Sequence, residues 1–197
     1  TLGGAKVVAF DKTGTLTEGR PRLTDVVVAE GANVTRREAL TLAAAAESRS
    51  EHPLARAVVE AAREEGLDVP DAAGFEAVAG RGVRAGAPGG VVLVGSARFL
   101  EESGAALGAL KEAAARLARE GKTPVYVALE GAGSVEALAV LAVADPVKAS
   151  AAPALARLRE LGVRTAMVTG DDARTANAVA RGLGLDDVRA EVLPGDK

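Results

Sequence analysis

The stretch Asp11-Lys12-Thr13-Gly14-Thr15-Leu16-Thr17 decides the fold that the sequence predicts. It follows Lys6–Phe10, a short apolar run that favours a buried parallel strand. A carboxylate at the carboxyl end of such a strand lies where open α/β sheets bind ligands. Gly14 allows a tight turn, and the threonines surround Asp11 with hydroxyl and N–H groups. The arrangement suits a carboxylate nucleophile that attacks phosphorus, although an isolated Asp-x-Thr-Gly also fits an ordinary strand-ending turn.

Composition limits the classes of protein and site that need to be considered. The 197 residues are enough for one or two domains, and 48% apolar with 2% aromatic content predicts a core of Ala, Val and Leu. A net charge of −3 gives no electrostatic case for binding nucleic acid or an anionic membrane. Without Cys, the chain has no disulfide, thiolate metal site or Cys nucleophile. The longest strongly apolar stretch, Ala137–Ala144, is far shorter than the roughly 18 residues of a membrane span.

The order of predicted helices and strands differs between the part of the chain after Asp145 and the segment before it. From Asp145 onwards, helices are expected at 150–161 and 172–182 and strands at 163–168 and 188–192. This order predicts a parallel sheet with right-handed crossovers, and Lys6–Phe10 would join it.

The intervening segment reads as a mixed domain. Helices are expected at 35–47, 53–66 and 108–119, and short strands at 75–79, 83–85, 91–94, 125–129 and 135–143. Thr35 and Glu38 form a capping box, and Pro53 suits the first position of a helix. We therefore predict an α+β antiparallel-sheet domain, residues 23–143, inserted into an α/β domain formed by residues 1–22 and 144–197.

The opening heptapeptide resembles the phosphorylation signature of the P-type ATPases. The resemblance implies that Asp11 is phosphorylated from ATP, with Lys12 and Thr13 in the same catalytic loop. It also implies a haloacid-dehalogenase-like Rossmannoid phosphorylation domain carrying an inserted nucleotide-binding domain. The related phosphatases usually have an acid/base Asp where this chain has Thr13, so the resemblance implies a phosphoenzyme that persists.

A second motif, Thr169-Gly170-Asp171, follows one predicted strand and precedes a helix. A hydroxyl and backbone N–H groups at a helix start are well placed to hold a phosphoryl group. Alternatively, Asp171 or Asp172 could simply cap the helix. The motif resembles the second phosphate-binding motif of the P-type ATPases, which implies catalytic roles for Thr169, Gly170 and Asp171.

Two further segments extend the resemblance. Pro194-Gly195-Asp196-Lys197 is similar to the family's Pro-x-x-Lys, which implies that Lys197 neutralises the transferred phosphoryl group. Asp145-Pro146-Val147-Lys148 is similar to its Asp-Pro-x-Lys, which implies a hinge with Asp145 and Lys148. A strand-to-helix turn accounts for the same residues.

The resemblance also implies a magnesium site. Mg²⁺ prefers hard oxygen ligands, and the Asp11 carboxylate and the Thr13 carbonyl could supply two. The family's third ligand lies beyond Lys197, so we expect this chain alone to bind Mg²⁺ weakly and to turn over poorly.

Ser50-Glu51-His52-Pro53 contains the only His of the chain. A lone His is more often structural than functional. The tetrapeptide, however, resembles a hallmark of the heavy-metal-transporting P-type ATPases, which implies that Glu51 and His52 contact the adenine of ATP.

Glycines complete the implied nucleotide site. Gly80-Arg81-Gly82 is similar to that subclass's Gly-x-Gly, which implies that Gly80 and Gly82 let the backbone approach the nucleotide, although a hairpin turn explains them equally well. Gly95-Ser96 stands where the family often has Gly-Asn, so a contact from Ser96 to the ribose or phosphate is left open.

These motifs identify the chain as similar to the ATP-binding and phosphorylation part of a heavy-metal P-type ATPase. The implied cofactors are ATP and Mg²⁺, and the implied partners are the pump's own transmembrane and actuator domains. We expect a monomer at the cytoplasmic face of a membrane that binds no nucleic acid. The start without Met and the end at Lys197 favour a soluble portion of a longer pump.

The transported ion and the class of enzyme leave alternatives. Asp145–Lys148 and Ala190–Pro194 look more like copper(I) pumps than zinc, cadmium or cobalt pumps. A soluble haloacid-dehalogenase-like phosphatase with a cap domain is the main rival, and a non-catalytic nucleotide-binding module is another.

Overall fold

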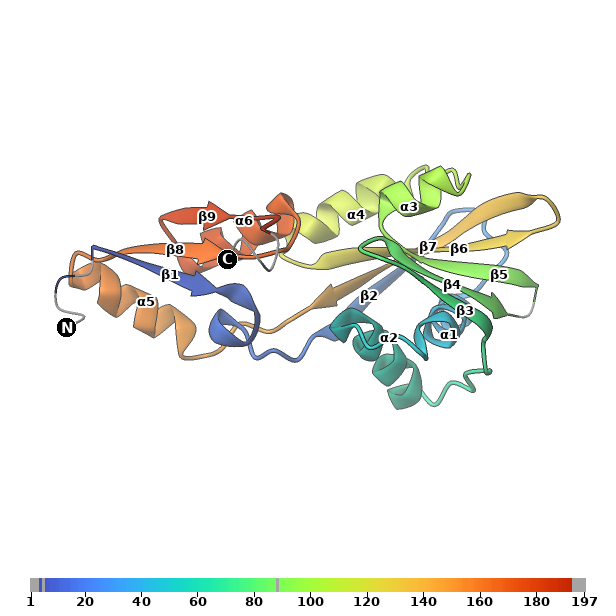
Figure 1. The fold of residues 1–197 in the computed structure, drawn as a ribbon, viewed down its shortest axis with the longest axis horizontal. Coiled ribbons are helices and arrows are strands. Elements are labelled where there is room, and N and C mark those ends of the chain that lie inside the picture. The colour runs from blue at the N-terminus through green and yellow to red at the C-terminus, as the bar shows by residue number, and fades with distance from the viewer. Residues whose placement is uncertain (1–3, 5, 88, 193–197) are drawn as a thin grey trace. The chain divides into compact units, whose positions relative to one another are not determined.

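The computed structural model describes residues 4, 6–87 and 89–192. The chain forms two compact units (Figure 1), which are described separately. The first comprises Thr1–Pro21, Ala118–Thr123 and Ala144–Lys197, and the second comprises Arg22–Leu117 and Pro124–Val143.

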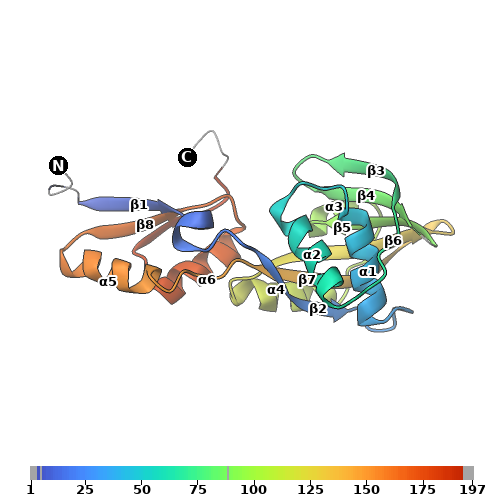
Figure 2. The same ribbon diagram turned by 90° about the horizontal axis from the view of Figure 1, so that it is seen from below.

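The first unit is built on a parallel sheet of strand order β1-β8-β9. Its elements are β1 (Val7–Asp11), the helical turn η2 (Lys12–Leu16), α5 (Ala151–Glu160), β8 (Arg164–Val168), α6 (Ala173–Leu183) and β9 (Asp187–Arg189). Successive strands are added in one direction, so both helices cover the same face of the sheet (Figure 2). Met167 and Leu155 are fully buried between this face and the helices. The carboxyl ends of the strands meet at one edge of the sheet, and that edge carries Asp11.

The second unit contains a six-stranded sheet of order β2-β7-β6-β5-β4-β3, in which β3 to β6 pair antiparallel. Its strands are β2 (Arg22–Val28), β3 (Ala73–Val78), β4 (Gly82–Ala87), β5 (Gly90–Gly95), β6 (Thr123–Gly131) and β7 (Ser134–Ala144). Its helices are α1 (Arg36–Glu47), α2 (Pro53–Glu64), α3 (Ala97–Glu102) and α4 (Leu110–Arg119).

Each face of this sheet has its own core. Helices α1 and α2 cover one face, where alanines of α1 pack against Val92 and Val94. Helices α3 and α4 cover the other, where Leu100 and Leu117 pack against Leu93 (Figure 1). Alternate residues of β5 therefore serve opposite cores, as the period of a strand requires.

The predicted fold class is confirmed, and so is the capping box. Thr35 Oγ1 accepts from the Glu38 N–H at 3.2 Å, and the Glu38 carboxylate accepts from the Thr35 N–H at 2.7 Å. The bond from the Thr35 backbone N–H, and after it a bond from the Thr35 hydroxyl to the carboxylate at 2.8 Å, hold the pKa of Glu38 below its ordinary value. Two elements were missed, β2 and the short helix α3.

The units also differ from the predicted domains at Arg22, which belongs to the second unit, and in one longer segment. Residues 118–123 belong to the first unit, whereas the sequence pattern placed them in the inserted domain. Within the first unit, Thr175 Oγ1 of α6 donates to the Lys122 carbonyl at 3.0 Å, and a Cβ on Gly121 would lie 3.2 Å from Val179. These contacts join residues far apart in sequence, which no local pattern reveals.

None of the helices in the described ranges is long and apolar enough to cross a bilayer.

Candidate active site

Asp11 and Thr169 lie at the same edge of the parallel sheet. The register pairs Asp11 with Val168, so Thr169 is the next residue on the neighbouring strand. The Thr169 N–H donates to the Arg189 carbonyl at 2.9 Å, and its own carbonyl accepts from the Val192 N–H at 3.0 Å. Thr169 is only 2% exposed, whereas Asp11 is exposed. The fold thus presents an accessible carboxylate beside a rigidly held threonine.

The loop after Asp11 turns back on itself within one short helical turn. Gly14 has a φ of +75°, a conformation that side-chain-bearing residues rarely adopt. Its N–H donates to Thr17 Oγ1 at 3.2 Å, and the Thr17 N–H donates to the Lys12 carbonyl at 3.1 Å. Thr13 is extended, with φ −74° and ψ 124°, which interrupts the helical turn.

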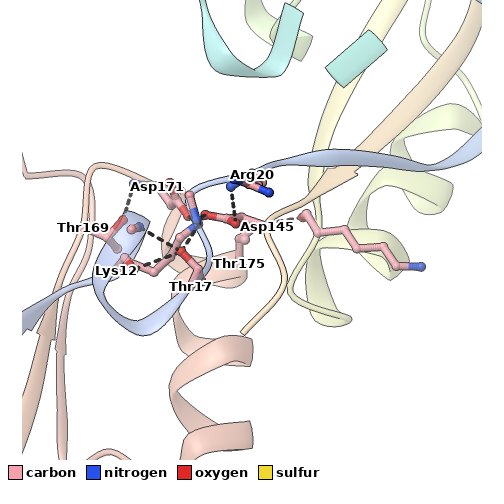
Figure 3. Close-up of polar contacts among 10 residues, drawn as sticks. Lys12, Thr17, Arg20, Asp145, Thr169, Asp171 and Thr175 are labelled. Atoms are coloured by element: carbon pink, nitrogen blue, oxygen red, sulfur yellow. Dashed lines mark hydrogen bonds and ion pairs between the residues drawn. The ribbon is translucent and has the colours of Figure 1, made fainter. Parts of the chain in front are cut away.

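Lys12 does not point to solvent. It is 7% exposed, and its ammonium forms an ion pair with the Asp171 carboxylate (Figure 3). Asp171 in turn donates its N–H to Thr169 Oγ1 at 3.2 Å. The two loops predicted to surround the phosphoryl group are therefore tied together by one charged contact.

The cap of helix α6 is Asp172, one of the two capping residues that the sequence allowed. Asp172 Oδ1 accepts from the Arg174 N–H at 2.9 Å. The Arg174 side chain, and then its backbone N–H, hold the pKa of Asp172 below the ordinary value against the opposing effect of burial. Because Asp172 caps the helix, Asp171 serves the pair with Lys12 instead.

The donor chemistry around Asp11 suits a hard cation in part. The Asp11 carboxylate and the Thr13 carbonyl are oxygen donors of the type Mg²⁺ prefers. Among the residues with described positions, no group of three or more His, Cys, Asp or Glu side chains could hold a metal. Lys197 and its Pro-x-x-Lys segment lie outside the described residues.

In the second unit, His52 is the N-cap of helix α2. Its Nδ1 accepts from the Leu54 N–H at 3.2 Å, and its own N–H donates to Ser50 Oγ at 3.4 Å. An accepting Nδ1 places the imidazole proton on Nε2 in the neutral ring. Both His52 and Glu51 are exposed, so they are accessible to a ligand.

Glu47 is a candidate residue that the sequence analysis missed. It is only 9% exposed, and burial raises its pKa to about 7 against the lowering effect of a hydrogen bond from Ser50. It lines a hollow of about 290 Å³ between α1 and α2, here called the α1–α2 hollow. The other lining residues are Ser48, Ser50, Arg56, Val59, Glu60 and Arg63. The sequence did contain a signal for this residue, because Glu47 lies four residues after Ala43 and so falls on the apolar face of α1.

The glycines of the predicted nucleotide site differ in what they do. Gly82 and Gly95 are directly opposite one another in β4 and β5. A Cβ on Gly82 would overlap the Val94 carbonyl and lie 2.9 Å from the Phe99 ring, and a Cβ on Gly95 would lie equally close to that ring. Close backbone packing therefore requires both glycines. Gly80 has a φ of +68° and open space around its missing Cβ, so it alone leaves room for a ligand.

Ser96 has a structural use in this chain. Its hydroxyl accepts from the Phe99 N–H at 3.3 Å and caps helix α3. This bond engages the same oxygen that a contact to the ribose or phosphate would need.

Residues 5–197 match the family model of the haloacid dehalogenase-like hydrolases. The chain belongs to this family. Asp11, the predicted nucleophile, is the last residue of β1.

Within this family, the chain is similar to ATPases that transport heavy metals. The chain is 48% identical over 196 residues to Copper-transporting ATPase 2 of Rhizobium meliloti, covering all of this chain and 23% of that protein. It is 38% identical to a zinc-transporting PIB-type ATPase of known structure, with a TM-score of 0.73, covering 99% of this chain and 30% of that one. The chain thus spans about a quarter of the length of the curated relative.

The second unit has its own counterpart. The crystal structure of the N-domain of HMA6, a copper-transporting P-type ATPase, matches with a TM-score of 0.52 and 28% identity, covering 64% of this chain and 99% of that domain. The predicted relationship to heavy-metal P-type ATPases is confirmed by these relatives. The roles of individual site residues stay predictions.

Proposed function

We propose that this chain is the ATP-binding and phosphorylation part of a copper(I)-transporting P-type ATPase, with Asp11 as the phosphorylated nucleophile. The observation that carries the proposal is the parallel register that sets Asp11 beside Thr169 at the carboxyl edge of the sheet. The 48% identity to a copper-transporting ATPase supports it independently. The partners would be the pump's transmembrane and actuator domains, with the chain on the cytoplasmic side.

The first chemical step is an in-line phosphoryl transfer. An Asp11 carboxylate oxygen bonds to the γ-phosphorus of ATP, the bond from that phosphorus to the bridging oxygen breaks, and ADP leaves with the electron pair. The Thr169 hydroxyl, which accepts from the Asp171 N–H, and the Gly170 N–H would donate to the transferring group. Lys197 would offset its charge.

Mg²⁺, held by the Asp11 carboxylate and the Thr13 carbonyl, would neutralise charge on the phosphate oxygens. Lys12 is paired with Asp171, so we assign it the part of fixing the loop.

The second unit would supply the nucleotide. Neutral His52 can stack on adenine and donate through Nε2, and Glu51 can accept from the exocyclic amine. The open space at Gly80 admits the ligand, while Gly82 and Gly95 hold the strands that form the site. Glu47 lines the α1–α2 hollow together with Ser50 and would add a carboxyl group near the adenine contacts.

Thr13 separates the proposed pump from a phosphatase. A Thr hydroxyl does not readily activate water, so water attacks the aspartyl phosphate slowly unless another group assists. A soluble phosphatase of this family would instead hydrolyse generic phosphoesters rapidly. Rapid turnover of p-nitrophenyl phosphate by this chain would therefore contradict the pump assignment.

ATP titration monitored by NMR tests the nucleotide site. We expect shifts at Glu51, His52 and Gly80 to Val83 that are largely lost in His52→Ala. In the full-length pump, radiolabelled ATP should leave an acid-stable, hydroxylamine-sensitive phosphate that Asp11→Asn abolishes. Unchanged labelling in Asp11→Asn would refute the nucleophile assignment.

The ion is tested separately, since both copper and zinc pumps resemble this chain. We expect copper(I) to stimulate phosphoenzyme formation by the full-length pump and zinc(II) to leave it unchanged. Stimulation by zinc(II) alone would replace copper with zinc and leave the phosphorylation chemistry intact.

A further inference from the structure

The carboxylate of Asp145 faces the turn that follows the Asp11 loop. Its Oδ2 lies 2.5 Å from Thr17 Oγ1 and accepts from the Gly19 N–H at 3.2 Å. Its Oδ1 accepts from the Arg20 N–H at 3.0 Å (Figure 3). One side chain thus collects three donors from a segment more than 120 residues away in sequence.

Thr17 carries this contact into the loop. It is 1% exposed, and its Oγ1 lies 3.1 Å from the Lys12 carbonyl as well as 2.5 Å from Asp145. A hydroxyl donates one proton, and the shorter contact to a carboxylate is the stronger one. The Thr17 hydroxyl therefore donates to Asp145 and accepts from the Gly14 N–H at 3.2 Å.

Lys148 holds the same loop from its carbonyl side. Its Nζ donates to the Gly14 carbonyl at 2.5 Å, and its backbone N–H donates to the Leu16 carbonyl at 2.9 Å. Both polar backbone groups of Gly14 are thereby fixed, one through Thr17 and one directly. Gly14 is the positive-φ residue on which the path of the chain after Asp11 depends.

A second close approach leaves the turn little freedom. Gly19 also has a positive φ, and a Cβ placed on it would lie 3.3 Å from the Gly14 Cα. The turn bound by Asp145 is thus packed directly against Gly14, in the turn that follows Asp11. Thr17 and Val147 form an isolated antiparallel bridge beside it.

We propose that Asp145 and Lys148 are positioning residues, which hold the Asp11 loop in its phosphoryl-accepting geometry through Thr17 and Gly14. This inference rests on the proposed function of Asp11. It differs from the hinge role that the sequence resemblance implied for these two residues, because their contacts are with the nucleophile loop itself. A displacement of about 1 Å at a reacting group can lower a rate about 100-fold.

The test compares Thr17→Val with Thr165→Val in the full-length pump. Thr165 serves as the control for Thr17, because it is equally buried and also binds a carboxylate. Its N–H and its hydroxyl donate to Asp186 at 2.7 and 3.0 Å. Thr165 is the second residue of β8, near the opposite end of the strand from Thr169. Both substitutions remove one buried hydroxyl bound to a carboxylate.

The readout is the single-turnover rate of acid-stable phosphoenzyme formation from ATP, together with ATP affinity and thermal stability. We expect Thr17→Val to slow phosphorylation about 10-fold to 100-fold with unchanged ATP affinity. Thr165→Val should change the rate less than about 2-fold with a similar loss of Tm. Thr17→Ser, which keeps the hydroxyl, should restore most of the rate.

Lys148→Met covers the case in which Thr17→Val does not fold, because it removes only the contact of an exposed ammonium with the Gly14 carbonyl. We expect it to slow phosphorylation about 10-fold. Equal rates in Thr17→Val and Thr165→Val, or a wild-type rate in Lys148→Met, would overturn the positioning role while the wild type still forms phosphoenzyme. A wild type that forms none would instead overturn the proposed function and the role together.

Discussion

Lys12 and Asp171 are 159 residues apart in sequence and form a part-buried ion pair at the edge of the parallel sheet. Lys12 directly follows Asp11, and Asp171 ends the Thr169-Gly170-Asp171 motif. The pair therefore fixes the distance between the two loops that the proposed chemistry needs together. Its energetic value lies in that constraint, because buried ion pairs often contribute little net stability.

Breaking this pair from one side should destabilise the first unit. Asp171→Asn leaves the Lys12 ammonium, whose side chain is 9% exposed, without a carboxylate. We expect a loss of about 2–3 kcal/mol in the free energy of unfolding. In the double variant with Lys12→Met, the loss should be smaller than the sum of the single losses, and urea unfolding of all four proteins measures the coupling.

An exposed ion pair supplies the control for that cycle. Lys111 and Glu101 are paired with side chains that are 55% and 42% exposed. Glu101→Gln should cost less than about 1 kcal/mol. A cost for Asp171→Asn no greater than this would show that the Lys12 pair does not constrain the loops.

The two glycines of Gly80-Arg81-Gly82 should respond very differently to alanine. Gly80→Ala meets only the strain of its positive φ, which is about 1 kcal/mol, because the space around its Cβ is open. Gly82→Ala drives a methyl group into the Val94 carbonyl and the Phe99 ring. We expect a loss of about 3 kcal/mol or more.

Thermal unfolding of the two glycine variants checks this difference. If Gly80 also admits the nucleotide, Gly80→Ala should fold and bind ATP more weakly. Similar unfolding temperatures for both variants would contradict the packing role of Gly82.

Local patterns predicted much of the fold. The capping box of Thr35 and Glu38 and the Pro53 helix start were predicted because both signals lie within one turn of a helix. The parallel sheet followed from alternating helix and strand patterns. Helix α3 was missed because six residues carry too little periodicity. Strand β2 was missed although Val26-Val27-Val28 is β-favouring and Gly31, with a φ of +81°, marks a turn after it.

The site was less accessible to sequence reasoning than the fold. Motifs named Lys12 and Asp171 separately, but their pairing depends on β1 and β8 lying side by side. The same holds for Asp145 and Thr17, which are in contact although most of the second unit lies between them in the sequence. Glu47 was missed although helical spacing places it four residues after Ala43, on the apolar face of α1.

Two substitutions should distinguish the helix-capping role of His52 from its proposed role in ATP binding. His52→Ala removes the acceptor for the Leu54 N–H and should cost about 1 kcal/mol of stability. His52→Asn keeps a cap acceptor and should cost little, since Asn is a preferred N-cap residue. Both variants should lose most ATP binding, because neither retains the imidazole. Titration calorimetry with ATP decides the question, and wild-type affinity in His52→Asn would confine His52 to the cap.

Glu47 should make stability depend on pH near neutrality. Burial raises its pKa to about 7 in the folded protein, against 4.5 for the ordinary group. Between these values the folded state holds a proton that the unfolded state has lost, so stability falls as pH rises through this window and then levels off. The fall from pH 4.5 to 8 can reach about 3 kcal/mol. Glu47→Gln should remove most of it and be the more stable protein at pH 8, with little difference at pH 4.5.

Urea unfolding across this pH range measures the effect, and Glu60→Gln is the matched control. Glu60 lines the same α1–α2 hollow but is exposed, so its substitution should leave the slope with pH unchanged. Ser50 hydrogen-bonds Glu47 and also accepts from the His52 N–H. Ionisation of Glu47 therefore changes the hydrogen bonding of His52, the predicted adenine contact. ATP affinity should therefore change more between pH 6 and pH 8 in the wild type than in Glu47→Gln. An unfolding free energy that is equally pH-dependent in wild type and Glu47→Gln would show that Glu47 is not the titrating group.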